Sequence, residues 1–338
     1  MKFALSIGAW LAPGAAVAAP PMTYLVSHGW PADPIKALDW GLLALSMFVV
    51  LFIAFAVLIG IWWKRGRGDY DDAGRPVVTR GRNGMPWLLV GVPVSIALLL
   101  LSAIWTFFVL AHAAAPPGHP KITLLVTAHQ WWWEVQYDEA GHPKRSFETA
   151  NEIHVPVGVP VAIHLKSADV IHSFWVPQLA GKTDAIPGQT NYAWLEADKP
   201  GVYRGQCTEF CGLQHAHMAL YVVAQPPRAF EAWWTRQLQP AAGFPAGFAS
   251  EGANVFEARC AVCHTVRGLA GSQGRMGPDL THLMSRHTIA AGTLTNNTGN
   301  LAAWISNAQA LKPGVDMPVE SLNGPQLQAL LAYMKTLK

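Results

Sequence analysis

Two uninterrupted apolar runs near the N-terminus constrain this chain more than any other feature. Residues 42–63 and residues 87–111 contain no charged side chain. As a helix, the first run is about 33 Å long, which is enough to cross the hydrocarbon core of a bilayer. Pro93 lies inside the second run, and a membrane helix tolerates it where neighbours satisfy the freed carbonyl groups. We therefore expect a transmembrane hairpin within residues 20–115 rather than a buried hairpin of a soluble domain.

The segment between the two runs, residues 64–86, sets the expected orientation of the hairpin. Cytoplasmic loops of membrane proteins are enriched in Lys and Arg. We therefore expect this loop in the cytoplasm, and everything after His112 on the outer, periplasmic side of a bacterial inner membrane. The charged side chains of the loop are the basic Lys64, Arg65, Arg67, Arg75, Arg80 and Arg82 and the acidic Asp69, Asp71 and Asp72.

Residues 1–19 have the pattern of a secretory signal peptide. Lys2 supplies a positive charge, residues 3–10 are apolar, and the Ala-Val-Ala of residues 16–18 is an A-x-A type of cleavage site. A short N-terminal membrane helix is the alternative, but Pro13 would interrupt it early.

The pattern changes to short alternating segments over residues 116–227. Turns rich in Pro and Gly separate these segments. Many short strands of this kind indicate a β-sandwich. The strands are expected over residues 121–128, 159–166, 191–196, 201–206 and 218–224.

A loop near the end of this region gathers metal-binding side chains. Cys207 and Cys211 are four residues apart, His215 follows after four more, and Met218 after three more. Thiolates and thioethers are soft ligands that suit copper. Zinc on two Cys and two His, or a disulfide between the two Cys, are the alternatives. Met218 counts against both, and His217 is less well spaced than His215 to share one metal.

The C-terminal region contains a second cysteine pair in the sequence Cys-Ala-Val-Cys-His of residues 260–264. This C-x-x-C-H pattern is the attachment signature of c-type haem, in which Cys260 and Cys263 bind the vinyl groups and His264 is an axial iron ligand. A redox dithiol or half of a zinc site are the alternatives. We expect a helical haem domain over residues 249–338, after a linker with a short helix over residues 228–248.

The sixth iron ligand is expected to be a methionine. Met317 stands in an irregular, Pro- and Gly-containing stretch before the last predicted helix, where small class I cytochromes c carry this ligand. Met334 falls inside that helix and is a better core residue, while Met276 and Met284 are weaker candidates.

The cysteine loop resembles the copper A loop of cytochrome c oxidase subunit II, C-x-E-x-C-x-x-x-H-x-x-M, at every position. Upstream, residues 169–177 are similar to the family pattern D-V-x-H-S-x-x-V-P, which supplies a second His. The resemblance implies a cupredoxin fold in which Cys207 and Cys211 bridge two copper ions. The remaining implied ligands are His172 and Met218 on one copper, and His215 with the backbone carbonyl of Glu209 on the other.

Other stretches extend this resemblance towards partners. Residues 129–133 are similar to the family's H-Q-W-x-W segment, which implies that Trp131 admits electrons to the copper site, whereas Trp133 reads as a core residue. Residues 181–188 resemble the stretch that faces subunit I. The Glu209 side chain could help hold Mg²⁺ there, together with ligands from the partner. No acidic residue occurs between Asp72 and Glu134, so the proton-uptake role of a subunit II Glu is in doubt here.

The fused C-terminal domain is similar to the tail of caa-type oxidases. The resemblance implies a subunit that takes electrons from a soluble donor such as cytochrome c and passes them to subunit I, where oxygen is reduced and protons are pumped; subunit III is a further expected partner.

The net charge of +3 is too small to suggest nucleic-acid binding. The alternatives are a tethered electron carrier without an oxidase, a copper-delivery protein, and a quinol oxidase subunit, which usually lacks the copper ligands.

Overall fold

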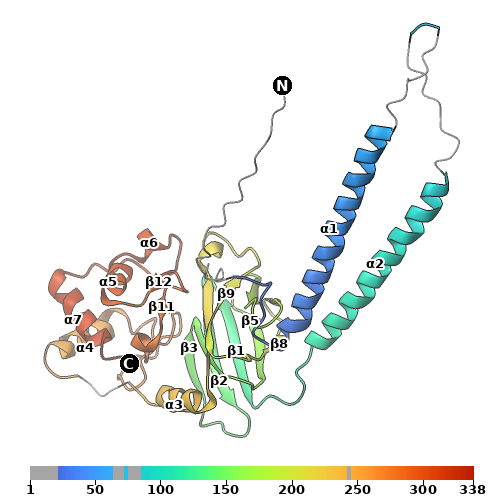
Figure 1. The fold of residues 1–338 in the computed structure, drawn as a ribbon. Coiled ribbons are helices and arrows are strands. Elements are labelled where there is room, and N and C mark those ends of the chain that lie inside the picture. The colour runs from blue at the N-terminus through green and yellow to red at the C-terminus, as the bar shows by residue number, and fades with distance from the viewer. Residues whose placement is uncertain (1–21, 64–71, 75–84, 242–244) are drawn as a thin grey trace, which may run out of the picture.

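The structure is a computed structural model, and it describes residues 22–63, 72–74, 85–241 and 245–338. The predicted signal peptide and most of the loop between the apolar runs lie outside the described residues. Helix α1 (Ala32–Trp63) and helix α2 (Met85–Ala113) cover the two apolar runs. Both are long and apolar enough to cross a membrane, and their large apolar side chains point outward along most of their length. Figure 1 shows them side by side, projecting away from the rest of the molecule.

Aromatic contacts fix the helix hairpin to the domain that follows. The indole nitrogen of Trp194 donates a hydrogen bond to the carbonyl of Ala113 at the end of α2, over 2.8 Å. Trp30, which precedes α1, packs between His112 and Trp194 with ring centroids 4.3 and 5.4 Å apart. Because both helix ends are held at one edge of the sheet structure, the described sandwich is placed next to the ends of the hairpin.

Ten short strands form a sandwich of two five-stranded sheets. Within each sheet one neighbouring pair is parallel, β1 with β5 and β4 with β10, and the other pairs are antiparallel. The first sheet contains, in spatial order, β3 (Phe147–Ala150), β2 (Trp132–Glu139), β1 (Ile122–His129), β5 (Val161–Ser167) and β8 (Asn191–Leu195). The second contains β4 (Glu152–Pro156), β10 (Ala219–Gln225), β9 (Gly201–Cys207), β6 (His172–Trp175) and β7 (Thr183–Ala185).

The core of the sandwich follows from the alternation along its strands. Every second residue of β1 is buried, because successive side chains of a strand point to opposite faces. Helix α3 (Pro227–Leu238) closes one end with Trp233 and Trp234, whose rings pack edge-on against Tyr137 and Phe147. Such aromatic pairs add to the free energy gained from burial alone.

The C-terminal domain is mainly helical and packs around α4 (Phe248–Arg259) and α7 (Gly324–Met334). The two helices approach so closely that a Cβ at Gly252 would overlap the carbonyl of Ala329. Figure 1 shows this domain beside the sandwich, away from α1 and α2. The other elements are the 3₁₀ turns η1 (His215–His217) and η2 (Leu283–Ser285), the two-residue strands β11 (Thr288–Ile289) and β12 (Leu294–Thr295), α5 (Thr298–Ser306) and α6 (Ala308–Leu311). Together with the hairpin and the sandwich, this confirms the fold class predicted from the sequence.

A buried carboxylate joins the two soluble domains. Glu152 in β4 is only 3% exposed. It accepts hydrogen bonds from Nε2 of His154 at 2.9 Å, and from the backbone nitrogen and Nδ1 of His287 in the helical domain at 2.8 and 3.0 Å. Burial opposes ionisation of Glu152, but the hydrogen bonds from the two histidines outweigh burial and lower its pKa.

Replacing Glu152 by Ala is therefore expected to lower the free energy of unfolding by about 3–5 kcal/mol, because it leaves buried donors without an acceptor. The matched control is Glu148→Ala, which breaks the more exposed ion pair with Arg275 (3.0 Å) between the same domains and should cost less than about 1 kcal/mol. Urea denaturation of the purified chain in detergent measures both.

The lowered pKa of Glu152 also predicts how the free energy of unfolding changes with pH. Because the folded-state pKa of Glu152 is lowered, its contribution is complete above the unfolded-state value of about 4.3 and is lost as the pH falls through the folded-state value. The difference in stability between the wild type and Glu152→Ala should therefore shrink below about pH 4. An equal loss of unfolding free energy in Glu152→Ala and Glu148→Ala would contradict this account. So would a difference between the wild type and Glu152→Ala that does not change with pH.

Candidate metal centre and haem site

Two paired strands bring the predicted copper ligands together. In the register of β6 and β9, Phe174 lies opposite Cys207, so His172 at the start of β6 comes next to the end of β9. The loop after β9 returns Cys211 to the same place. The turn η1 then begins with His215, and Met218 immediately precedes β10.

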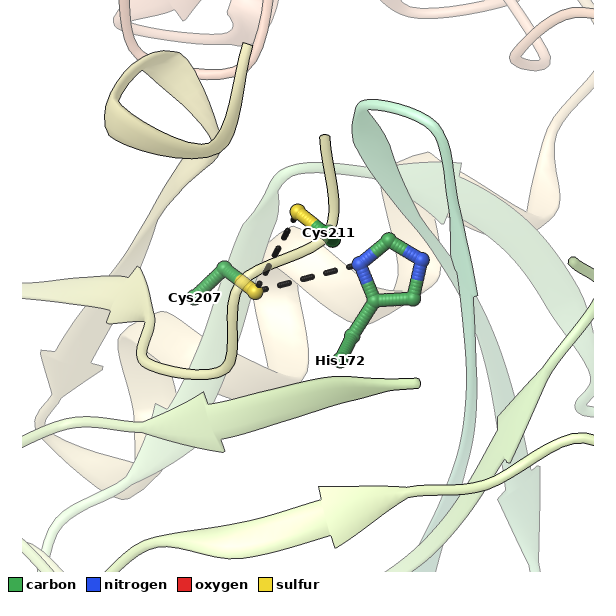
Figure 2. A group of neighbouring side chains, drawn as sticks. All are labelled: His172, Cys207 and Cys211. Atoms are coloured by element: carbon green, nitrogen blue, oxygen red, sulfur yellow. Dashed lines mark hydrogen bonds between the residues drawn. The ribbon is translucent and has the colours of Figure 1, made fainter. Parts of the chain in front are cut away.

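The side chains of these ligands meet in one buried cluster. The sulfur atoms of Cys207 and Cys211 are 3.8 Å apart, and Nδ1 of His172 lies 3.8 Å from the Cys207 sulfur. Figure 2 shows these three side chains pointing towards one another. Nδ1 of His215 and the sulfur of Met218 lie 3.6 and 3.9 Å from the sulfur of Cys211. The carbonyl oxygen of Glu209 lies 3.3 Å from the sulfur of Cys207.

The thiols of Cys207 and Cys211 differ in acidity. The contact with the Cys211 thiol holds the pKa of Cys207 well below its usual range, while the same contact and burial raise the pKa of Cys211. Burial disfavours the charged form of His172, but its contacts with Cys207 and Asp169 outweigh burial and raise its pKa. Metal binding requires both thiols to lose their protons, and Cys207 loses its proton more readily than Cys211.

Asp169 orients His172 from outside the cluster. Its carboxylate lies 2.8 Å from Nε2 of His172, which leaves Nδ1 directed at the thiols. The same carboxylate accepts from the backbone nitrogens of Gln130 and Val170, both at 2.6 Å. The sequence interpretation did not assign Asp169 a role, although its place three residues before His172 was a usable signal.

The donor chemistry of the cluster fits copper better than the alternatives. All four cysteines of the chain are free, so Cys207 and Cys211 form no disulfide. His217 lies outside the cluster, where its Nδ1 contacts the side chain of Gln214 over 2.8 Å. The thioether of Met218 is fully buried beside Cys211, and a soft ligand in this place suits copper.

A second site lies in the helical domain. A cavity there is lined by the Cys260, Cys263 and His264 of the attachment motif. Nδ1 of His264 lies 2.9 Å from the carbonyl of Pro278, which fixes the tautomer that leaves Nε2 free for a metal. Gly277 packs flat on the imidazole, and a Cβ there would lie 2.5 Å from the ring. Burial lowers the pKa of His264, which favours the neutral, ligating form.

Three of the four candidate methionines line this cavity. They are Met276, Met317 and Met334. The side chain of Met276 is 74% exposed, and Met334 is buried in the helical core. Met317 is half-buried on the segment before α7, and its carbonyl accepts a hydrogen bond from the side chain of Gln309 over 2.9 Å.

Two buried polar atoms in the cavity wall support the fit of a haem. Within the described part of the chain, Nε of Arg286 and Oγ1 of Thr288 have no hydrogen-bond partner, and both residues line the cavity. Unpartnered buried donors are rare in folded proteins and point to a missing acceptor. A haem propionate has the charge and oxygen atoms to serve both. The sequence interpretation named neither residue, because nothing local distinguishes them from other polar side chains.

Trp131 contacts both sites. Its indole nitrogen donates to the carbonyl of Cys211 over 2.9 Å, and the residue also lines the haem cavity. Its ring is only 8% exposed, because the helical domain packs over it. Trp131 therefore lies at the surface of the copper domain but not at the surface of the whole chain. Trp133, by contrast, is fully buried in the sandwich core, with its ring edge-on to that of Phe174.

The position of Glu209 bears on the predicted magnesium site. Its side chain is half-buried on the copper loop, and residues 181–188 include β7, an edge strand of the second sheet. Among the described residues, the close groups of three His, Cys or acidic ligand atoms comprise only His172, Cys207 and Cys211. This group does not include Glu209, so a magnesium site there stays a prediction.

These features define a protein with two helices long and apolar enough to cross a membrane, a cupredoxin-like sandwich that carries a cluster of soft metal ligands, and a helical C-terminal domain with a haem-attachment motif. Residues 139–225 match the family described as cytochrome c oxidase subunit II, periplasmic domain, and residues 249–338 match the cytochrome c family. The chain belongs to the family of cytochrome c oxidase subunit 2, in the form with a fused cytochrome c domain.

Two relatives of known identity support this assignment, and one solved structure is similar to part of the chain. Cytochrome c oxidase subunit 2 of Alkalihalophilus pseudofirmus is 35% identical over 88% of this chain and 84% of its own length. The protein of the same name from Bacillus sp. (strain PS3) is 30% identical over 82% of this chain and 80% of its own length. A crystal structure of the periplasmic domain of subunit II of the Bradyrhizobium japonicum oxidase is 32% identical and covers 36% of this chain and 95% of that domain, with a TM-score of 0.32.

The Met218→Leu variant is expected to change the copper spectrum and to leave the haem spectrum unaltered. The exchange conserves volume and should cost less than about 1.5 kcal/mol of stability, so a loss of the copper signal would reflect the missing thioether. Optical and electron paramagnetic resonance spectra of the purified chain measure both centres. A normal copper spectrum in this variant would remove Met218 from the ligand set.

The Met317→Leu variant is expected to have the reverse effect, with an altered haem spectrum and an unaltered copper spectrum, because a leucine cannot ligate iron. Met276→Leu on the same cavity wall is the matched control and should keep the haem spectrum of the wild type. If Met276→Leu alone changes the spectrum, the sixth ligand is Met276.

Proposed function

We propose that this chain is the electron-accepting subunit of a terminal cytochrome c oxidase. Electrons from a soluble donor such as cytochrome c enter at the helical domain and leave through the copper domain to subunit I, where oxygen is reduced to water and protons are pumped. When bound, the dinuclear copper centre and the haem each take up and release one electron. The chain itself would fix the positions of these two groups and exclude water from them.

The observation that carries the proposal is the position of Trp131 between the two sites. Its indole bonds to the carbonyl of the copper-loop residue Cys211, and the same residue lines the haem cavity. Because the fused domain covers this ring, a soluble donor would act on the helical domain and not on Trp131 directly.

The residues proposed to hold each group are those that the sequence predicted. Cys207, Cys211, His172, His215, Met218 and the backbone carbonyl of Glu209 would hold the two copper ions. Cys260 and Cys263 would hold the haem covalently, with His264 and Met317 as axial ligands. The distances between side chains in the copper cluster and the shared cavity wall support these assignments.

The proposal also includes partner subunits, an orientation in the membrane and the limits of the domains. The edge strand β7 and the half-buried Glu209 side chain would face subunit I, with Mg²⁺ between them, and subunit III would belong to the same complex. In the proposed orientation the loop between α1 and α2 is cytoplasmic, and both redox domains lie on the periplasmic side. Cleavage of a signal peptide near residue 19 and domain limits at residues 116–227 and 249–338 are parts of the same proposal.

Purification of the full chain from a bacterium able to attach haem tests the proposal. We expect a mixed-valence signal of two copper ions beside a low-spin c-type haem, and co-purification of subunit I. A haem signal with a mononuclear copper or zinc site would refute the electron-relay assignment of the loop from Cys207 to Met218. Both metal centres without any subunit I would favour a tethered electron carrier.

A further inference from the structure

A buried lysine lies where the two redox domains meet. Lys312 follows α6 in the haem domain, and only 2% of its surface is exposed. Its ammonium group donates to the backbone carbonyl of Trp131 in the copper domain over 2.8 Å and to that of Ala290 over 3.3 Å. Burying an ammonium group is costly unless it is well hydrogen-bonded, and burial lowers the pKa of Lys312 to about 7. Such a group calls for a specific role.

The turn that supplies one of these carbonyls is strained. Ala290 and Ala291 have φ angles of +53° and +55°, a left-handed conformation that is unfavourable for residues with a Cβ. In this conformation the carbonyl of Ala290 accepts from Lys312, and that of Ala291 accepts from the backbone nitrogen of Ala219 over 3.0 Å. Ala219 directly follows the copper-site residue Met218. The turn therefore joins Lys312 to the copper loop.

The residues after Lys312 also contact the copper domain. The side chain of Gln214, next to His215 in the copper loop, donates to the carbonyl of Pro313 over 2.8 Å. Gly314 packs against Leu213 and the ring of Trp131, which a Cβ at this position would meet at 3.2 and 3.6 Å. Three successive residues of the haem domain thus contact the copper loop or Trp131.

The same segment leads directly to Met317. Gln309 of α6 donates to the carbonyls of both Val315 and Met317, at 2.5 and 2.9 Å. One side of the segment 312–317 is therefore tied to α6, and the other side is tied to Trp131 and the copper loop. Lys312 is the charged group of this connection, and it also lines the haem cavity.

We propose that Lys312 is a positioning residue for electron transfer between the two domains: its ammonium group holds the Met317 segment and the turn at Ala290 against the backbone of Trp131. This inference rests on the proposed function. It predicts that loss of the ammonium group loosens the domain contact without removing a ligand of either metal. Because the charge lines the haem cavity, its removal should also favour the oxidised haem and lower the reduction potential.

The test compares Lys312→Met with Lys335→Met in the full chain, assembled in its oxidase. Lys335 is an exposed lysine at the end of α7 in the same domain, so its replacement makes the same chemical change at a remote surface. Hydrogen–deuterium exchange of the peptides that cover residues 288–293 and 310–318 reports the domain contact without any turnover. Flash reduction of the haem reports the rate of electron transfer to copper, and a redox titration reports the haem potential.

We expect Lys312→Met to accelerate exchange in both peptides, to slow electron transfer roughly tenfold, and to lower the haem potential, with both metal spectra unchanged. Lys335→Met should leave all readouts at wild-type values. Two results would overturn the proposal. Faster hydrogen–deuterium exchange with an unchanged transfer rate would show that Lys312 has only a structural role. Unchanged exchange would show that Lys312 does not hold the domain contact.

Two further outcomes keep the test decisive. If Lys312→Met prevents incorporation of haem or copper, Lys312→Gln, which has a polar side chain but no ammonium group, replaces it. A wild-type transfer rate in that variant would overturn the proposed role of the ammonium group. If the wild-type chain itself transfers no electron from haem to copper, the proposed function fails. Wild-type transfer that Lys312→Met leaves unaffected refutes only the role of Lys312.

Discussion

The pairing of β6 with β9 is the contact on which the copper site depends. It brings His172, 35 residues upstream, to the end of the strand that carries Cys207. The loop after β9 can return Cys211 locally, but no local geometry can supply the second imidazole. Since a slip of one residue would turn every side chain of β6 to the opposite face, the register is fixed by the buried Phe174 and its edge-on contact with Trp133. The sandwich core therefore determines the ligand geometry.

The membrane hairpin contributes position rather than chemistry. Trp194 and Trp30 tie the ends of α1 and α2 to the first sheet, so the sandwich is held beside the helix ends and not at the end of a free tether. The copper cluster lies at one end of the second sheet, in which β7 is an edge strand. A fixed angle between the anchor and the sandwich would keep the copper loop at a constant distance from any partner in the same membrane.

Much of this arrangement could be predicted from the sequence because its signals are local. The apolar runs, the C-x-x-C-H motif and the cysteine loop each need only neighbouring residues. Strands β2, β3, β4, β6 and β7 were not among the predicted strands. Three of them, β3, β6 and β7, have only three or four residues, which show no reliable alternation. Asp169, Arg286 and Lys312 were missed for a different reason: their roles arise from atoms far away in the chain, such as the carbonyl of Trp131 for Lys312. Local patterns cannot reveal such contacts.

The covalent connection helps to explain why the domain interface can contain buried polar groups. The nine residues between α3 and α4 keep the effective concentration of the haem domain high, so the contact needs little intrinsic affinity. What electron transfer requires is one defined geometry. Buried polar groups are poor sources of affinity but penalise wrong registers strongly, because each misplacement leaves a donor or a charge without a partner. Glu152 and Lys312, at separate places in the interface, each impose this penalty. An apolar interface of the same size could slide; this one has a single arrangement in which both groups are satisfied.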